Sequence, residues 1–239
     1  MIIYENLSAS ETLAWAIATF GKSFAIATSF QKEGMVIVDL AVRISPGVRI
    51  FTLDTGRLPE ETYRMIEAVR TRYGSTVEVV SPDREEVERM VAGHGPDLFY
   101  SSVELRQMCC EVRKVRPLAR KLLELEAWAT GLRREQSETR AALRRVERVD
   151  GRIKINPLVD WTAAEVDSYL REDDVPVHPL YAQGYASIGC APCTRAIIPG
   201  DDPRSGRWWW EQDSPKECGI HFDATHRPVR IDRAADPRG

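Results

Sequence analysis

The sequence predicts an α/β protein with a mostly parallel sheet and flanking helices. Three observations predict this class. A short apolar run at 24–29 (FAIATS) precedes a helical pattern at 33–44, a second run at 48–53 (VRIFTL) precedes a helix that starts near Pro59, and a third run follows at 76–80. Strand, helix and strand at this spacing are typical of right-handed βαβ units, whose parallel strands are covered by helices.

The remaining elements follow in chain order. A helix at 83–91 opens with acidic residues, which favour a helix N-terminus. We then expect a basic helix at 111–124, a short strand at 127–130, a strand at 152–155 and a helix that ends near Leu170. Thr162 and Glu165 form a capping box at the start of that last helix.

Domain organisation follows from a change in composition past about residue 175. The chain has 239 residues, which suits one large domain with a small appendage. Residues 1–175 are expected to form the α/β domain. Residues 176–239 are rich in Gly, Pro and aromatic residues, and we interpret them as a C-terminal extension laid over the sheet, not as an independent domain. The charged end of this extension is expected to be a mobile tail.

Composition and charge narrow the function classes. Lys and Arg number 33 against 36 Asp and Glu, a formal net charge of −3, and this balance gives no support to nucleic-acid or membrane-surface binding. No apolar run approaches the roughly 20 residues that span a bilayer, and the N-terminus lacks a secretory leader. We expect a cytoplasmic protein.

Polar loops follow three of the predicted strands, at 29–33, 53–57 and 131–134, and two of them carry Arg. Ligands of parallel sheets bind beyond the carboxyl ends of the strands, so these loops are the candidate binding site. Neither G-x-G-x-x-G nor G-x-x-x-x-G-K-[ST] occurs in the chain, which weakens the case for a dinucleotide fold or a Walker-type NTPase.

The chain has five cysteines: a vicinal pair, Cys109 and Cys110, a C-x-x-C, Cys190 and Cys193, and a lone Cys218. An odd count indicates a reducing compartment and metal or catalytic work. Thiolates suit zinc or an iron–sulfur cluster. Adjacent thiolates ligate different irons of a broad cubane more easily than one zinc ion, but buried thiols beside a redox or zinc turn remain an alternative on spacing alone.

Three further groups have both a functional and a structural interpretation. Lys114 lies four residues after Cys110, either on a solvated helix face or directed toward a cluster or anionic substrate. Cys218, between Lys216 and His221, is either a nucleophile that its basic neighbours activate or an unreactive exposed thiol. The Arg-x-x-Arg-Trp-Trp-Trp segment at 204–210 either binds an anion or packs as an aromatic strand.

Taken together, five segments resemble the assimilatory adenylyl-sulfate (APS) and phosphoadenylyl-sulfate (PAPS) reductase family over roughly residues 24–221. The matching segments are Leu53-Asp-Thr-Gly-Arg57, Gly131-Leu-Arg-Arg-Glu-Gln-Ser137, Cys109-Cys110 with Cys190-x-x-Cys193, Gly206-Arg-Trp-Trp-Trp-Glu211 and Lys216-Glu-Cys-Gly-Ile-His221. The resemblance implies a fold like that of the ATP pyrophosphatases (adenine nucleotide alpha hydrolase-like). The expected phosphate loop, 29–34, has no Gly between Ser29 and Glu33, which argues against pyrophosphate release.

In this family the four paired cysteines hold a [4Fe-4S] cluster and accompany a preference for APS. The resemblance therefore implies an APS reductase of sulfate assimilation and cysteine biosynthesis. In the implied reaction the Cys218 thiolate attacks the sulfur of APS, AMP leaves, and reduced thioredoxin releases sulfite from an S-sulfocysteine. Two alternatives stay open: a PAPS reductase, and a metal-binding sulfur-transfer or nucleic-acid-modifying protein on the same fold. A homo-oligomer is compatible with the family, which includes assemblies.

The resemblance also implies roles for individual residues. The expected catalytic residues are Cys218, His221 and Lys114, with His221 covering the site or orienting Cys218. Planar Arg donors suit the two anionic groups of APS. The expected substrate-binding residues are Ser29, Leu53, Gly131, Arg133, Arg140, Arg204 and Arg207, and the expected cluster ligands are Cys109, Cys110, Cys190 and Cys193.

Overall fold

A six-stranded sheet with the order β3-β2-β1-β4-β6-β5 forms the centre of the protein. The computed structural model describes residues 4–137 and 140–211. All neighbouring strands pair in parallel except β5 and β6, which are antiparallel. The predicted α/β class is confirmed. The strands are β1 (Phe24–Ala27), β2 (Arg49–Leu53), β3 (Val77–Val80), β4 (Ala127–Ala129), β5 (Val146–Val149) and β6 (Arg152–Ile155).

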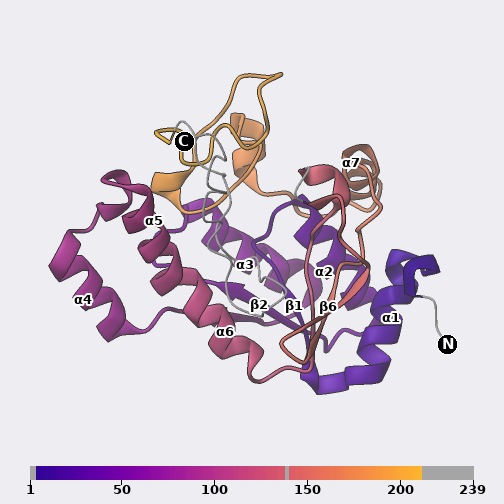
Figure 1. The fold of residues 1–239 in the computed structure, drawn as a ribbon. Helices are drawn as coiled ribbons and strands as arrows, with labels where there is room; N and C mark the ends of the chain where they lie inside the picture. The colour runs from indigo at the N-terminus through magenta and orange to yellow at the C-terminus, as the bar shows by residue number, and fades with distance from the viewer. Residues whose placement is uncertain (1–3, 138–139, 212–239) are drawn as a thin grey trace, which may run out of the picture.

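Helices cover both faces of this sheet (Figure 1). The helices are α1 (Ala9–Phe20), α2 (Lys32–Ile44), α3 (Glu60–Tyr73), α4 (Arg84–His94), α5 (Val103–Cys110), α6 (Arg116–Leu122) and α7 (Ala163–Glu172). Apolar side chains of α1, α2, α3 and α7 form the main core with one face of the sheet. On the other face, Leu118 and Leu122 of α6 pack on Ala25, Phe51 and Trp128.

The helix expected at 111–124 differs in the structure. It starts earlier, as α5, and passes through a π-helical segment, Glu111–Val115, before α6. The Ser102 hydroxyl accepts a hydrogen bond from the Leu105 amide and caps α5. Because the π-helical turn has a wider register than an α-helix, the spacing from Cys110 to Lys114 is not that of ordinary i,i+4 neighbours. Neither α1 nor β5 was expected from the sequence.

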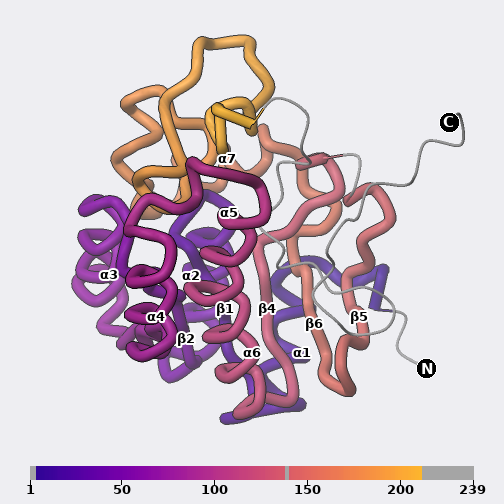
Figure 2. The backbone as a smooth tube through the Cα atoms, turned by 60° about the vertical axis from the view of Figure 1, so that its left-hand side comes forward, coloured from indigo at the N-terminus to yellow at the C-terminus, as the bar shows by residue number. Residues whose placement is uncertain are grey.

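The extension after residue 175 packs above the carboxyl ends of the strands, as Figure 2 shows in orange and yellow. Backbone amide hydrogen bonds join it to the loops after β1 and β2 and to the start of α2. The Ala191 amide donates to the Arg57 carbonyl at 2.8 Å, the Ile188 amide donates to Gln31 Oε1 at 3.0 Å, and the Lys32 amide donates to the Tyr181 hydroxyl at 3.4 Å. The described part of the extension therefore borders the carboxyl ends of the strands.

Within the described residues, the helices are too short or too polar to cross a membrane.

A charge cluster fixes α6 to the sheet. Arg49 of β2 donates two hydrogen bonds to the Glu78 carboxylate of β3, at 2.8 and 3.1 Å, and Lys121 of α6 donates a third at 2.5 Å. These donors lower the pKa of Glu78 to about 2, with the Arg49 hydrogen bonds as the largest cause. Since the π-helical segment Glu111–Val115 joins the two adjacent cysteines to α6, this cluster helps to position them.

We predict that Glu78→Gln makes the free energy of unfolding less sensitive to pH in the acid range. The ordinary pKa of 4.5 is lowered to about 2 on folding, so Glu78 stabilises the fold above about pH 4.5, and this contribution is lost as the pH falls toward 2. Urea midpoints at neutral pH and at about pH 3 measure the effect. Glu88→Gln, in an exposed pair with Arg84, is the control, and an equal acid slope in the Glu78 variant and the wild type contradicts the prediction.

Candidate active site

A pocket of about 930 Å³ opens at the carboxyl edge of the sheet. It is bounded by the loops after β1, β2 and β4, as the sequence predicts, and by residues of the extension. The pocket lining includes every described residue that the sequence assigned to substrate binding or catalysis: Ser29, Leu53, Lys114, Gly131, Arg133, Arg140, Arg204 and Arg207. Cys218 and His221 lie outside the described residues.

The loop after β1 is a tight turn. Phe30 is fully buried with a φ of 57°, and its amide donates to the Thr28 hydroxyl at 2.9 Å. A Cβ at Gly34 would lie only 2.6 Å from that hydroxyl oxygen. The first turn of α2 therefore needs glycine at this position, and its backbone amides lie at the pocket edge, where they suit an anion.

The loop after β4 packs directly against α2. A Cβ at Gly131 would come within 2.9 Å of Glu33 Cβ and 3.1 Å of the Gly34 nitrogen. Glu33 Oε1 also accepts hydrogen bonds from Arg133 Nε and Gln136 Nε2, both at 2.9 Å. The two loops thus form one rigid rim of the pocket.

Two of the expected substrate-binding arginines are buried among protein contacts. Arg133 is 6% exposed, and its guanidinium also donates to Glu135 and to the Trp161 carbonyl. Arg207 is 4% exposed, donates to the Cys193 carbonyl, and lies over the Trp208 ring with its guanidinium carbon 4.7 Å from the centroid. Both residues line the pocket, but these contacts give them a positioning role that sequence patterns did not reveal.

The four paired cysteines line a single smaller cavity. Cys109 and Cys110 end α5, whereas Cys190 and Cys193 border a 3-10 turn of the extension. All four are free thiols, three buried and Cys110 partly exposed. In the parts of the chain that the structure describes, no three His, Cys, Asp or Glu side chains are grouped tightly enough to hold one metal ion.

Cationic side chains surround this cavity: Arg57, Arg106, Arg113 and Lys114. Burial raises the pKa of the Cys193 thiol to about 12 and raises that of Cys109, which the nearby Arg113 opposes. Two buried donors, Arg113 Nε and Trp208 Nε1, have no hydrogen-bond partner, and Thr55 Oγ1 lies 3.2 Å from Cys190 Sγ. Four soft donors, unsatisfied N–H groups and positive charge fit an anionic thiolate-bound cluster.

Lys114 connects the two cavities. It lines the cysteine cavity and also the large pocket. The sequence left open whether Lys114 lies on a solvated face or is directed toward a cluster and substrate. Its place in the π-helical segment favours the second interpretation, because this one residue lines both cavities.

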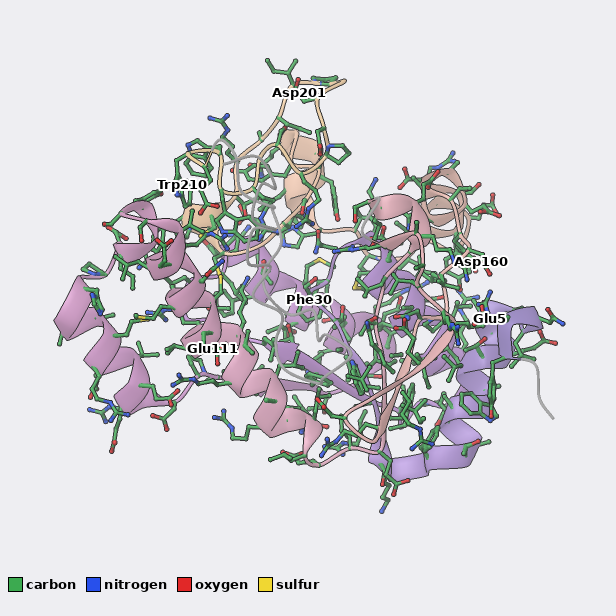
Figure 3. The ribbon with its side chains drawn as sticks, in the orientation of Figure 1. Glu5, Phe30, Glu111, Asp160, Asp201 and Trp210 are labelled. Carbon is green, nitrogen blue, oxygen red and sulfur yellow. The ribbon has the colours of Figure 1, made fainter. Side chains whose placement is uncertain are left out.

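A buried ion pair that the sequence did not predict joins the extension to α5. Arg106 Nε donates to Glu211 Oε1 at 2.5 Å, with the two side chains 3% and 4% exposed. The Arg106 guanidinium also lies over the Trp208 ring, 4.5 Å from its centroid. Figure 3 shows Trp210 at the same junction, and its ring centroid is 4.5 Å from that of Tyr100. Glu211 is the last described residue before the segment that carries Cys218.

We predict that Arg106→Met destabilises the protein by about 3–5 kcal/mol, because it removes one partner of a buried ion pair and leaves the charge of Glu211 buried. Urea unfolding measures the loss. The double variant Arg106→Met with Glu211→Leu should recover most of it, since neither charge of the buried pair then remains. A loss no larger than that of Arg84→Met, in an exposed pair, contradicts the prediction.

Known proteins are similar to this chain over most of its length. Residues 23–196 match the family model described as the phosphoadenosine phosphosulfate reductase domain. An adenosine 5'-phosphosulfate reductase from Burkholderia cepacia is 53% identical over 82% of this chain and 79% of its own length. One from Allochromatium vinosum is 51% identical over 89% of this chain and 87% of its own.

Solved structures agree with this likeness. A phosphoadenylyl-sulfate (PAPS) reductase from Candida auris superposes with a TM-score of 0.66 at 34% identity, over 78% of this chain and 90% of that one. An FMN adenylyltransferase from Candida glabrata, 15% identical with a TM-score of 0.53 over 79% of this chain and 67% of its own, shares the fold alone. From its family match and these relatives, the chain belongs to the phosphoadenosine phosphosulfate reductase family.

Proposed function

We propose that this chain reduces adenosine 5'-phosphosulfate to sulfite and AMP in sulfate assimilation. The observation that carries this function is the junction at Lys114, where a cavity lined by four cysteines meets a nucleotide-sized pocket. Relatives at 53% and 51% identity bear the name of this activity. The enzyme is an oxidoreductase that acts on a sulfur group.

We propose a [4Fe-4S] cluster as the cofactor, held by Cys109, Cys110, Cys190 and Cys193. When bound, the cluster supplies local charge and structural support beside the substrate. The donor set supports this choice, because four thiols from two distant segments line one cavity with unpaired N–H donors. Lys114 is then placed to balance charge between cluster and substrate.

The pocket lining supports a binding mode for APS. Ser29, Leu53 and Gly131 border the carboxyl ends of β1, β2 and β4, where the adenosine is expected in parallel sheets. Arg140, Arg204 and Lys114 supply cations for the phosphosulfate group. Arg133 and Arg207 stabilise the walls of the pocket through their buried contacts with Glu33 and the Cys193 carbonyl.

The proposed reaction has two displacements. The Cys218 thiolate attacks the sulfur of APS, a sulfur–sulfur bond forms, and the sulfur–oxygen bond to AMP breaks with its electron pair on AMP. One thiolate of a reduced dithiol donor of the thioredoxin type then attacks Cys218 Sγ, and sulfite leaves with the electron pair. The second donor thiol displaces Cys218 and completes a disulfide, so the donor supplies both electrons. His221 orients Cys218.

Location and assembly are also proposals. The free state of the four described cysteines supports a reducing compartment such as the cytoplasm. A homo-oligomeric assembly stays a prediction.

We predict that Cys218→Ser lowers sulfite formation by about a thousandfold or more, because the hydroxyl is a far weaker nucleophile at neutral pH. Sulfite release from APS with reduced thioredoxin measures this. Single turnover with sulfur-labelled APS, followed by peptide mapping, should place the label on Cys218 in the wild type. Label on another peptide, or full activity in the variant, contradicts the mechanism. A higher kcat/KM with PAPS than with APS would indicate a PAPS reductase.

We predict that Cys193→Ser sharply lowers the iron content and the brown colour of anaerobically purified protein, because one of four ligands is lost. Elemental analysis and visible absorbance measure it. Cys218→Ser is the matched control and should keep its iron, since it is not a ligand. Zinc in place of iron in the wild type would instead favour a metal-binding sulfur-transfer protein.

A further inference from the structure

A lysine stands on the sheet face that α6 covers only in part. In the strand register Ala25 pairs with Trp128 and Trp128 pairs with Lys154, and paired residues of neighbouring strands share a face. Ala25 and Trp128 of this face pack under Leu118 of α6 in an apolar core. Farther along the same row, Lys154 of β6 lines the large pocket.

The environment of Lys154 disfavours its positive charge. Its side chain is 16% exposed, and burial, the largest cause, lowers its pKa, as does the positive charge of Arg140. Its carboxylate partner, Glu147 Oε2, is 3.4 Å away across the antiparallel pair. That same oxygen also accepts a hydrogen bond from Asn156 Nδ2 at 3.1 Å. A charge with this burial and one long contact gains from an additional anion.

The pocket supplies a route for such an anion. Leu118 of α6 and Trp128 line the pocket together with Lys154, and Lys114 lines it from the π-helical segment that leads into α6. Lys154 is the penultimate residue of β6, so it lies close to the carboxyl edge where the nucleotide loops end. The phosphosulfate group is the most strongly charged part of the proposed substrate.

We propose that Lys154 is a further substrate-binding residue, whose ammonium group holds the phosphosulfate of APS from the floor of the pocket. The inference rests on the proposed function for the identity of the anion. It assigns substrate contact to a strand residue outside every motif that identified the site.

The competing explanation is structural, with Lys154 serving only to neutralise Glu147 across the strand pair. The two explanations differ in what removal of both charges does. If Lys154 only balances Glu147, then Glu147→Gln with Lys154→Met restores binding. If Lys154 binds substrate, the double variant binds as weakly as Lys154→Met alone.

The test measures dissociation constants of APS, AMP and adenosine for the intact iron-loaded protein by calorimetry. Lys154→Met keeps most of the apolar stem and removes the charge. Arg152→Met is the matched control, because Arg152 lies on the same strand and face, donates to the Leu125 carbonyl and does not line the pocket. Circular dichroism and iron content verify that each variant is folded.

We expect Lys154→Met to weaken APS binding by about tenfold or more, the loss of one charge-assisted contact, with adenosine binding unchanged. Weakened AMP binding places the contact at the phosphoryl group, and unchanged AMP binding places it at the sulfonate. Unchanged APS affinity, an equal loss for adenosine, or recovery in the double variant overturns the inference. A wild-type protein that neither binds APS nor forms sulfite overturns the proposed function instead.

Discussion

The docking of the extension onto the loop after β2 is the constraint on which both cavities depend. The hydrogen bond from the Ala191 amide to the Arg57 carbonyl fixes the turn that carries Cys190 and Cys193. Thr55 on the same loop contacts the Cys190 sulfur. Without this docking, the C-x-x-C would not face the end of α5, some 80 residues earlier in the chain, and the large pocket would lose the wall that bears Arg204.

Charge balance then relates the two cavities. A thiol cavity surrounded by arginine and lysine favours an anionic occupant, and so does a pocket that combines Lys114, Lys154, Arg140 and Arg204. Cluster and substrate would each neutralise part of the same positive charge, with Lys114 between them. The affinity for APS should therefore depend on whether the cluster is bound, because Lys114, which lines both cavities, would change partners.

Much of the fold was predictable, because apolar runs and helix caps are local signals. The start of α5 was not predicted. The helical turn that contains Arg106 and Gln107 shows no apolar periodicity, and the distant Glu211 stabilises it. Sequence motifs identified most of the candidate site residues. They did not predict the burial of Arg133, which depends on Glu33, 100 residues away in the chain. The role of Lys154 was not predicted, because residues 152–155 (RIKI) alternate polar and apolar residues as a strand with one solvent-facing side does. In the structure β5 lies outside β6, so β6 is an inner strand of the sheet.

The buried contacts around Trp208 give the Cys218 segment a fixed origin. Arg106 and Arg207 both lie over the Trp208 ring, and Arg106 also holds Glu211. Six residues lie between Glu211 and Cys218, and the seven steps from one to the other span at most about 24 Å when extended. If Cys218 is the nucleophile, as proposed, its thiol acts within this distance of the buried Glu211. A short connection of this kind would raise the effective concentration of the thiol at APS.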